Sequence, residues 1–275
     1  MRILQIIITA LFIATFAVGL VSRIGYRRDN TLPALTLDSD AIHVSVSDGE
    51  DKLLSGVSAY DAKDGDLTGR VIVESVSRFL EPGVAKVTYA VWDDDDHVVK
   101  ASRKVIYDDY TEPEFYLRRS LIFGNSQSVN ITRCLGAYDV MDGDISSRVI
   151  ITSTDYQAST SDVFYIDARV TNSKGGSASL ELPVFIEERN ISAPVITLES
   201  YLRFIGVGEE IDIWQNLISA VASENEGFVD LRASVRIDTD LDTSTPGTYL
   251  VHYYATDSSD RTSHEILVVV VKGGE

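Results

Sequence analysis

The feature that most constrains the fold is an internal repeat with a period of roughly 80 residues, which is typical of tandem small domains rather than of a solenoid. An Ala-Tyr-Asp-x-x-Asp-Gly-Asp segment occurs at residues 59–66 and again at 137–144. A Pro-Gly pair opens a Val- and Tyr-rich run at residues 82–93 and again at 246–257. We therefore expect an N-terminal segment and three domains, at residues 1–28, 29–110, 111–190 and 191–275.

Each copy of the repeat is predicted to be all-β. Runs of β-branched and aromatic residues, such as residues 42–46, 86–91 and 266–271, are separated by Asp, Gly and Ser turns. About seven short strands in roughly 80 residues are typical of a β-sandwich. The alternation of apolar and polar residues indicates antiparallel sheets with one solvated face. The expected fold is three tandem β-sandwiches after one N-terminal helix.

The motif Gly-x-x-Ala-x-Asp-x-x-Asp-Gly-Asp-Leu-Thr, followed by Pro-Gly-x-x-x-Val-x-Tyr-x-x-x-Asp, resembles the bacterial immunoglobulin-like (Ig-like) domain of surface and crystal-toxin proteins, related to the hyalin-repeat type. In the first copy it is carried by Gly56, Ala59, Asp61, Asp64, Gly65, Asp66, Leu67, Thr68, Pro82, Gly83, Val87, Tyr89 and Asp93. The second copy matches moderately, and the third matches mainly through its Pro-Gly-Thr-Tyr half. The resemblance implies Ig-like sandwiches that act as spacers or adhesive modules outside the bacterial cell.

Residues 3–21 carry no charge and predict a membrane helix. At about 1.5 Å rise per residue such a helix is roughly 28 Å long, close to the thickness of a bilayer core. A cleaved signal peptide is the alternative, with residues 17–19 as a candidate cleavage site. Arg23 and the following arginines would favour a cytoplasmic C-terminal region by the positive-inside rule, but large domains translocate largely regardless of charge. We expect an uncleaved single-pass anchor in the cell membrane, with extracellular C-terminal domains.

Composition excludes several classes of function. The chain has 24 Lys and Arg against 42 Asp and Glu, a formal net charge of −18, which argues against a nucleic-acid partner. The lone Cys134 allows neither an intramolecular disulfide nor a thiolate metal site. The four histidines belong to no catalytic motif, so we expect no enzyme. A glycosidase that uses two of the many carboxylates is the enzymatic alternative.

Carboxylates gather in loops that a sandwich of this type places at one end. The loop around Asp64 would face the loop after Trp92, and the end of one copy would meet the next copy's loops. Such charges repel unless a cation intervenes, and Ca²⁺ takes about six to eight oxygen ligands. The hypothesis is that Ca²⁺ stiffens the end-to-end junctions into a rod. Its candidate ligands are Asp61, Asp64, Asp66, Asp93, Asp95, Asp108, Asp109, Asp139, Asp142 and Asp144. The alternative is that these aspartates cap turns.

These features predict a membrane-anchored bacterial cell-surface protein with a non-catalytic adhesion or spacer role. Its partner would be a protein or a glycan, and the acidic surface favours a basic protein or a cation. The alternative is an accessory or assembly subunit of a membrane-embedded envelope complex.

Overall fold

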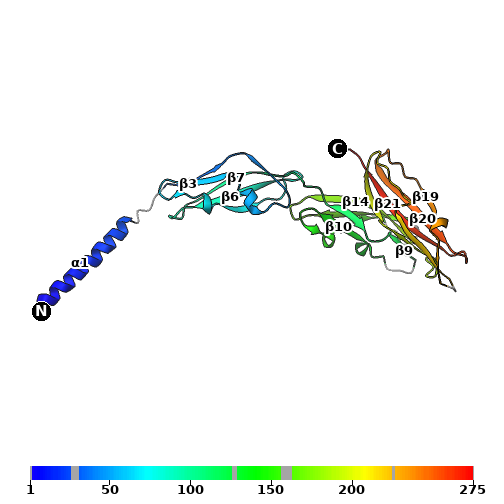
Figure 1. Ribbon diagram of the computed structural model, residues 1–275, viewed down its shortest axis with the longest axis horizontal. Helices are drawn as coiled ribbons and strands as arrows, with labels where there is room; N and C mark the ends of the chain where they lie inside the picture. The colour runs from blue at the N-terminus through cyan, green and yellow to red at the C-terminus, as the bar shows by residue number, and fades with distance from the viewer. Residues whose placement is uncertain (1, 26–30, 126–128, 156–162, 225–226, 275) are drawn as a thin grey trace. The chain divides into compact units, whose positions relative to one another are not determined.

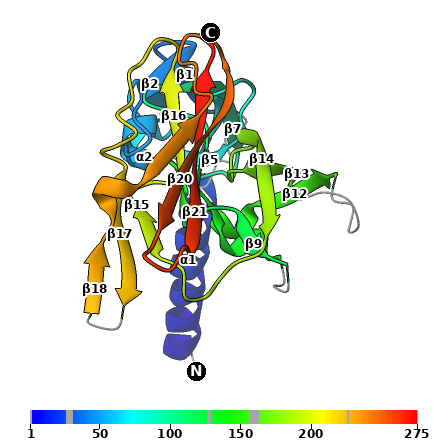
Figure 2. The same cartoon turned by 90° about the vertical axis from the view of Figure 1, so that its right-hand side faces the viewer.

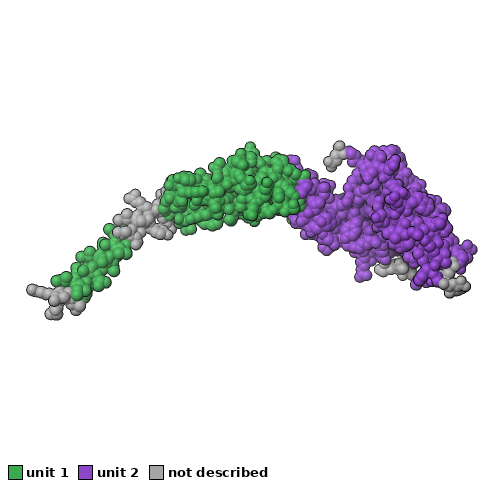
Figure 3. All heavy atoms as spheres, in the orientation of Figure 1, with its two compact units in different colours: residues 1–80, 84–108 green, residues 81–83, 109–275 purple. Residues whose placement is uncertain are grey.

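The computed structural model describes most of the chain, namely residues 2–25, 31–125, 129–155, 163–224 and 227–274. The chain divides into two compact units, which Figure 3 colours separately. The first unit comprises residues 1–80 and 84–108, and the second comprises residues 81–83 and 109–275.

An α-helix, α1 (Arg2–Gly25), occupies the region where the membrane anchor was expected. Crossing a bilayer takes about 20 consecutive, predominantly apolar helical residues. Among the residues that the structure describes, no helix is long and apolar enough to span a membrane. The transmembrane anchor expected at residues 3–21 is therefore not supported. Residues 26–28 of the expected N-terminal segment lie outside the described residues.

The first copy of the repeat consists of β1 (Ala34–Leu37), β2 (Ala41–Val44), α2 (Glu50–Leu53), β3 (Val57–Asp61), β4 (Gly65–Asp66), a 3₁₀ turn η1 (Thr68–Arg70), β5 (Ile72–Val76), β6 (Val84–Trp92) and β7 (Val98–Tyr107). They form two sheets, β1-β3-β4 and β2-β7-β6-β5 (Figure 1). Every second residue of β6 faces the core, and Val87, Tyr89 and Val91 are completely buried. This alternation is the pattern that the sequence predicted for a sandwich with solvated outer faces.

The second copy repeats this order with β8 (Glu114–Leu117), β9 (Ile122–Gly124), η2 (Ile131–Arg133), β10 (Leu135–Asp139), β11 (Gly143–Asp144), η3 (Ser146–Arg148), β12 (Ile150–Thr154), β13 (Val163–Thr171) and β14 (Ser177–Glu187). Its sheets are β11-β10-β8 and β12-β13-β14-β9. Cys134 is completely buried in the core of this copy, where its Sγ accepts a hydrogen bond from Arg119 Nε at 3.1 Å and donates to the Asn130 carbonyl at 3.5 Å.

The third copy consists of β15 (Val195–Leu198), β16 (Leu202–Gly206), β17 (Leu217–Glu224), β18 (Gly227–Asp230), η4 (Arg232–Ser234), β19 (Arg236–Thr239), β20 (Gly247–Thr256) and β21 (Thr262–Lys272). Its sheets are β15-β17-β18 and β16-β21-β20-β19. In each copy the second strand pairs in parallel with the last strand, and the described hairpins are antiparallel. The described strands thus form three pairs of sheets, which confirms the all-β prediction.

The second and third copies pack against each other through strand β21. Leu267, Val269 and Val271 face the core of the third copy, whereas Ile266 and Val268 belong to the core of the second copy. Figure 2 shows β21 and β16 between the β15-β17 layer and the strands of the second copy. This face contact differs from the end-to-end junction that we expected, because the sheet is apolar on both faces.

Candidate functional site

The Asp-Gly-Asp loop of the first copy is a hydrogen-bonded turn. Asp61 is 2% exposed, and its Oδ1 accepts the backbone N–H groups of Lys63 at 2.8 Å and Asp64 at 3.0 Å. Gly65 then adopts φ +79°, a conformation that favours glycine. Asp66 Oδ1 accepts the backbone N–H of Thr68 at 2.9 Å, and hydrogen bonding to Thr68 lowers the pKa of that carboxyl. The geometry of the turn therefore explains why Asp61, Gly65 and Asp66 occur at these positions.

The structure brings this loop together with the loop after β6, as the sequence predicted. Asp64 Oδ2 accepts the backbone N–H of Asp94 at 2.8 Å. The remaining negative charge is matched by cationic side chains. Lys63 Nζ lies 2.5 Å from Asp95 Oδ2, and Arg70 Nη1 lies 2.7 Å from Asp94 Oδ1. Repulsion between the carboxylates is therefore relieved here by Lys and Arg side chains.

Asp93 closes the loop after β6. Its Oδ1 accepts the N–H groups of Asp95 at 2.9 Å and His97 at 2.8 Å, and its Oδ2 lies 2.7 Å from His97 Nδ1. Burial raises the pKa of Asp93, but the hydrogen bonds from His97 and Asp95 outweigh it and hold the pKa below its usual value. In the third copy the equivalent residue is Asp257, which accepts the backbone N–H groups of Ser259 and Arg261 and pairs with the Arg261 side chain.

The second copy builds the same end of its sandwich. Asp139 is 1% exposed and accepts N–H groups from Met141 and Asp142, both at 3.0 Å. Asp142 accepts the backbone N–H and the hydroxyl of Ser173 and pairs with Arg148. Burial raises the pKa of Asp142, but the Ser173 bonds and Arg148 more than offset this and lower it.

Asn172 connects this end of the second copy to the segment that precedes β8. Its Nδ2 donates to Asp139 Oδ2 at 3.0 Å and to the Tyr110 hydroxyl at 3.2 Å. Its Oδ1 accepts the N–H groups of Lys174 and Gly176. An added Cβ at Gly176 would lie 1.9 Å from the Tyr110 hydroxyl, so the Tyr110 side chain would have to move to admit a larger residue. Tyr110 therefore packs closely against the Asn172 loop of the second copy.

The other candidate calcium ligands lie in separate surroundings. Asp108 Oδ1 is 2.7 Å from His43 Nδ1 on the surface of the first unit, and Asp109 belongs to the second unit. Asp144 resembles Asp66, because hydrogen bonds from Ser146 lower its pKa. In the described part of the chain, no group of three or more His, Cys, Asp or Glu side chains is arranged to hold a metal ion. Calcium binding stays a prediction.

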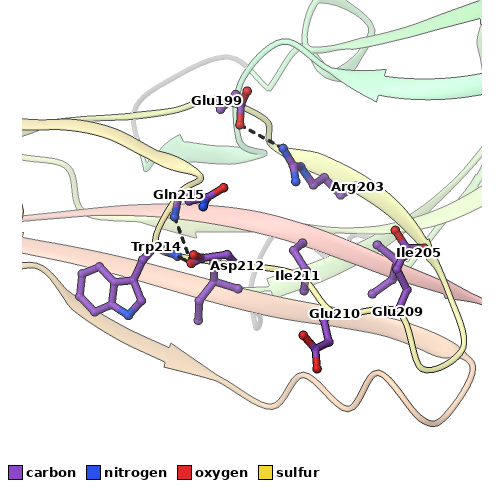
Figure 4. Close-up of a pocket in the computed structure, with 10 residues that line it drawn as sticks. Glu199, Arg203, Ile205, Glu209, Glu210, Ile211, Asp212, Trp214 and Gln215 are labelled. Atoms are coloured by element: carbon purple, nitrogen blue, oxygen red, sulfur yellow. Dashed lines mark hydrogen bonds and ion pairs between the residues drawn. The ribbon is translucent and has the colours of Figure 1, made fainter.

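The third copy has a hollow of about 700 Å³ beside its β16–β17 connection (Figure 4). Its lining is Glu199, Arg203, Ile205, Glu209, Glu210, Ile211, Asp212, Ile213, Trp214 and Gln215. Four carboxylates and one guanidinium therefore line the hollow, and Glu199 and Arg203 form an ion pair of 3.0 Å. In Figure 4 the Trp214 ring lies at one end of the hollow and Glu209 at the other.

Trp214 is fixed at its backbone but exposed at its ring. Asp212 Oδ1 accepts the N–H groups of Trp214 at 2.9 Å and Gln215 at 3.2 Å. The buried Tyr253 donates its hydroxyl to the Ile213 carbonyl at 2.6 Å. The Trp214 side chain is nevertheless 52% exposed and also borders a second hollow of about 490 Å³. A large apolar ring held in solvent in this way is a candidate contact residue.

Sequence reasoning did not single out Trp214. The available signal is a comparison between copies: Tyr89 donates to the Leu53 carbonyl just as Tyr253 donates to that of Ile213. The next residue is Leu54 in the first copy and Trp214 in the third. A partly buried leucine is thus replaced by an exposed indole.

Comparisons with known proteins agree with the repeat motif. A family model described as the Ig-like domain of bacterial surface proteins matches residues 214–269. An 81.3 kDa protein of Acholeplasma phage L2 is 29% identical over 140 residues, and pesticidal crystal protein Cry22Aa of Bacillus thuringiensis is 28% identical over 142 residues. Each alignment covers 50% of this chain, which spans only 19% of either relative's length.

Among solved structures, the structure of CBM51-2 in complex with GlcNAc and INT domains from Clostridium perfringens ZmpB is 17% identical. The match covers 53% of this chain and 30% of that chain. Its TM-score of 0.27 is too low to support a conclusion about fold or function. The matched family model and the crystal-toxin relative support a bacterial immunoglobulin-like domain in this chain, which the family model places at residues 214–269.

Proposed function

We propose that the protein is a non-catalytic adhesion or scaffold protein of the bacterial surface, and that its third Ig-like domain binds a basic surface of a partner protein. The observation that carries this proposal is the exposed indole of Trp214 at the rim of an acidic hollow. The matched family model covers this residue, since it spans residues 214–269.

The lining of the hollow defines the chemistry of the partner. Its four carboxylates outnumber the single Arg203 guanidinium, so the hollow attracts cationic groups. An exposed indole face binds Lys or Arg side chains through cation–π attraction. Tryptophans also dominate binding energy at protein interfaces because they bury a large area. A segment rich in Lys and Arg combines both requirements.

The loop carboxylates support a non-catalytic role. General acid–base catalysis needs a carboxyl group within hydrogen-bond reach of a substrate and a pKa close to the working pH. Asp61 and Asp139 are instead buried and accept backbone N–H groups of their own turns. The pKa of Asp93 is held below its usual value, and that of Asp142 is as well. Lowered pKa values favour ionised caps over proton donors.

The test is a binding measurement on the immobilised full chain by biolayer interferometry. The probes are a Lys/Arg-rich peptide, an acidic peptide of equal length and a neutral polysaccharide. We expect the basic peptide to bind and the acidic peptide not to bind, with affinity falling as salt is raised. Trp214→Ala should weaken the binding at least about tenfold, as expected for a central aromatic contact.

Trp92→Ala is the matched control, because Trp92 is 41% exposed but lies on the first copy. It should bind the basic peptide like the unmodified chain. Equal losses in the two variants would contradict the proposed surface. Hydrolysis of the polysaccharide or of either peptide by the purified chain would contradict the non-catalytic role.

A further inference from the structure

A chain of three titratable side chains crosses the contact between the second and third copies. His252 Nδ1 lies 2.9 Å from His264 Nε2, and His264 Nδ1 lies 3.0 Å from Glu187 Oε2. His252 and His264 come from the β20–β21 hairpin, whereas Glu187 ends β14 of the second copy. The His264 side chain is only 12% exposed. One hydrogen-bonded chain thus connects the two copies.

Aromatic rings enclose the two imidazoles. Phe185 of β14 meets both rings edge-on, with centroid distances of 5.9 Å to His252 and 6.3 Å to His264. Tyr254 stacks on His264 at 4.5 Å. The two imidazoles also stack on each other, with centroids 5.1 Å apart. The surroundings favour an uncharged His252, because burial disfavours the positive charge of a protonated imidazole.

The hydrogen-bond pattern determines how many protons the Glu187, His264 and His252 side chains can accept together. An ionised Glu187 can only accept, so the neutral His264 carries its proton on Nδ1 and donates it to the carboxylate. Its Nε2 then accepts from Nδ1–H of His252. A first added proton is tolerated, because a charged His264 can donate at both ends. A second proton would place two N–H groups and two like charges face to face across 2.9 Å.

More negatively than positively charged groups lie around the two imidazoles. Glu187 faces His264 from β14, and Asp238 of β19 is paired in register with His252, with Asp240 in the following loop. Arg236 lies 4.4 Å above the Tyr254 ring. Burial lowers the pKa of His252 first, and the neighbouring His264 lowers it further, while the carboxylates oppose both effects. The balance keeps His252 neutral at neutral pH.

Protons can reach His264 and Glu187 from solvent. A hollow of about 320 Å³ borders His264 and Glu187. The remaining charged groups of its lining are Glu188, Arg189 and Glu265, of which Arg189 and Glu265 form an ion pair of 2.9 Å. Ser120 also bonds to Glu265, so the hollow lies along the contact between the copies.

We propose that the Glu187–His264–His252 chain is a proton-operated latch, which holds the second and third copies together at neutral pH and loosens their contact when both imidazoles are protonated. The sign follows from linkage at His252: in the unfolded chain it binds a proton near the ordinary histidine pKa of about 6.5, and in the latched state burial and the neighbouring His264 lower its pKa. The contact therefore weakens as pH falls below about 6.5 and is fully kept above it.

The test is hydrogen–deuterium exchange on the full chain at pH 7.5 and 5.0, corrected for the intrinsic exchange rate. We expect peptides from β14 and β21 to exchange at least about tenfold faster at pH 5.0, and peptides from β6 to change little. In His252→Gln the amide can either donate to or accept from His264 but takes up no proton. Its pH response should therefore fall below about twofold.

His43→Gln is the matched control, because His43 lies on the exposed surface of the first copy. It should respond to pH like the unmodified chain. An unchanged exchange rate in β14 and β21 at pH 5.0, or a full response in His252→Gln, would overturn the latch. If that variant fails to fold, NMR titration of labelled histidines in the unmodified chain decides. Coupled titration of two imidazoles supports the latch, and two independent titrations near 6.5 overturn it.

Discussion

The outer faces of equivalent sheets differ between the first and third copies: one is charged and exposed, and the other is apolar and buried. Lys104 of β7 pairs with Lys86 and with Ala41, and both lysines are exposed. At the corresponding positions of the third copy, Val268 of β21 pairs with Leu250 and Leu202. Val268 is 4% exposed and belongs to the core of the second copy.

This difference explains why one copy forms a unit of its own and the other two share one. The inward residues of the two sheets are alike, since both sandwiches fill their cores with Val, Ala and Tyr. A lysine pair costs little in solvent but is expensive to bury. The outward residues Lys86 and Lys104 of the first copy, and Leu250 and Val268 of the third, therefore account for the difference in packing.

The largest expected effect comes from making the third copy resemble the first. Val268→Lys places an ammonium group at a position that is 4% exposed. We expect it to lower the free energy of unfolding of the second unit by about 3 kcal/mol or more, because the charge is buried without a partner. Urea unfolding monitored by circular dichroism measures the loss.

The reciprocal substitution Lys104→Val is the matched control for that change. Its site is exposed, so the free energy of unfolding should change by less than about 0.5 kcal/mol. Equal effects of the two substitutions would contradict the assignment of β21 as a strand buried on both faces.

A smaller effect should separate the two buried tyrosines that occupy equivalent positions. Tyr89 accepts a hydrogen bond from Arg103 Nε at 2.8 Å and donates to the Leu53 carbonyl, whereas Tyr253 donates to the Ile213 carbonyl. Tyr89→Phe should cost about 2 kcal/mol, because it leaves part of a buried guanidinium unpaired. Tyr253→Phe should cost about 1 kcal/mol. Urea unfolding of both variants measures the difference, and a larger loss at Tyr253 would contradict the expected order.

The equivalent of Arg103 in the third copy is Leu267, which explains why the two networks differ. Both residues point inward from the last strand, and Leu267 is completely buried. The first copy thus stabilises its core edge with a guanidinium that also contacts Asp38 at 3.0 Å. The third copy uses packing alone at this position.

Short-range patterns in the sequence predicted much of this fold. Alternating residues marked the strands, and the Asp-Gly-Asp motif marked a turn whose glycine adopts positive φ in Gly65 and Gly143. The run at residues 266–271 was recognised only as a last strand. Burial of both its faces depends on Phe185 and other residues of the second copy, distant in sequence. No local sequence pattern predicts the contact between residues 266–271 and the second copy.

The candidate contact and latch residues were harder to predict for the same reason. His252 and His264 are brought together by the hairpin, but Glu187 is 77 residues away from His264 in the sequence. Trp214 looks like an ordinary apolar residue until its exposure is known. Side chains that serve a surface or an interface carry no periodic signal, whereas core residues do.

Alkaline pH should reveal the buried tyrosines with an effect of about 1 kcal/mol. Burial raises the pKa of Tyr253 to about 12, and it also raises the pKa of Tyr89. The unfolded chain releases these protons near pH 10, so the folded chain binds more protons above that value. Stability should therefore be level up to about pH 10, and Tyr253 alone should lower it by roughly 1 kcal/mol by pH 11.

Tyr253→Phe tests the cause of that decline, since it removes the tyrosine whose pKa burial raises to about 12. Urea unfolding between pH 9 and 11 should show a shallower loss in this variant than in the unmodified chain. An identical decline in both proteins would assign the alkaline sensitivity to other groups.

The smallest expected effect concerns calcium, which distinguishes turn-capping aspartates from metal ligands. Asp61 and Asp139 already accept two backbone N–H groups each, and Lys63, Arg70 and Arg148 neutralise neighbouring carboxylates. A cation would have to displace these partners. We expect the melting temperature in excess calcium and in chelator to differ by less than about 1 °C, because a ligand stabilises a fold only in proportion to its affinity for it. A rise of several degrees that Asp64→Asn and Asp142→Asn remove would instead establish calcium binding at these two loops.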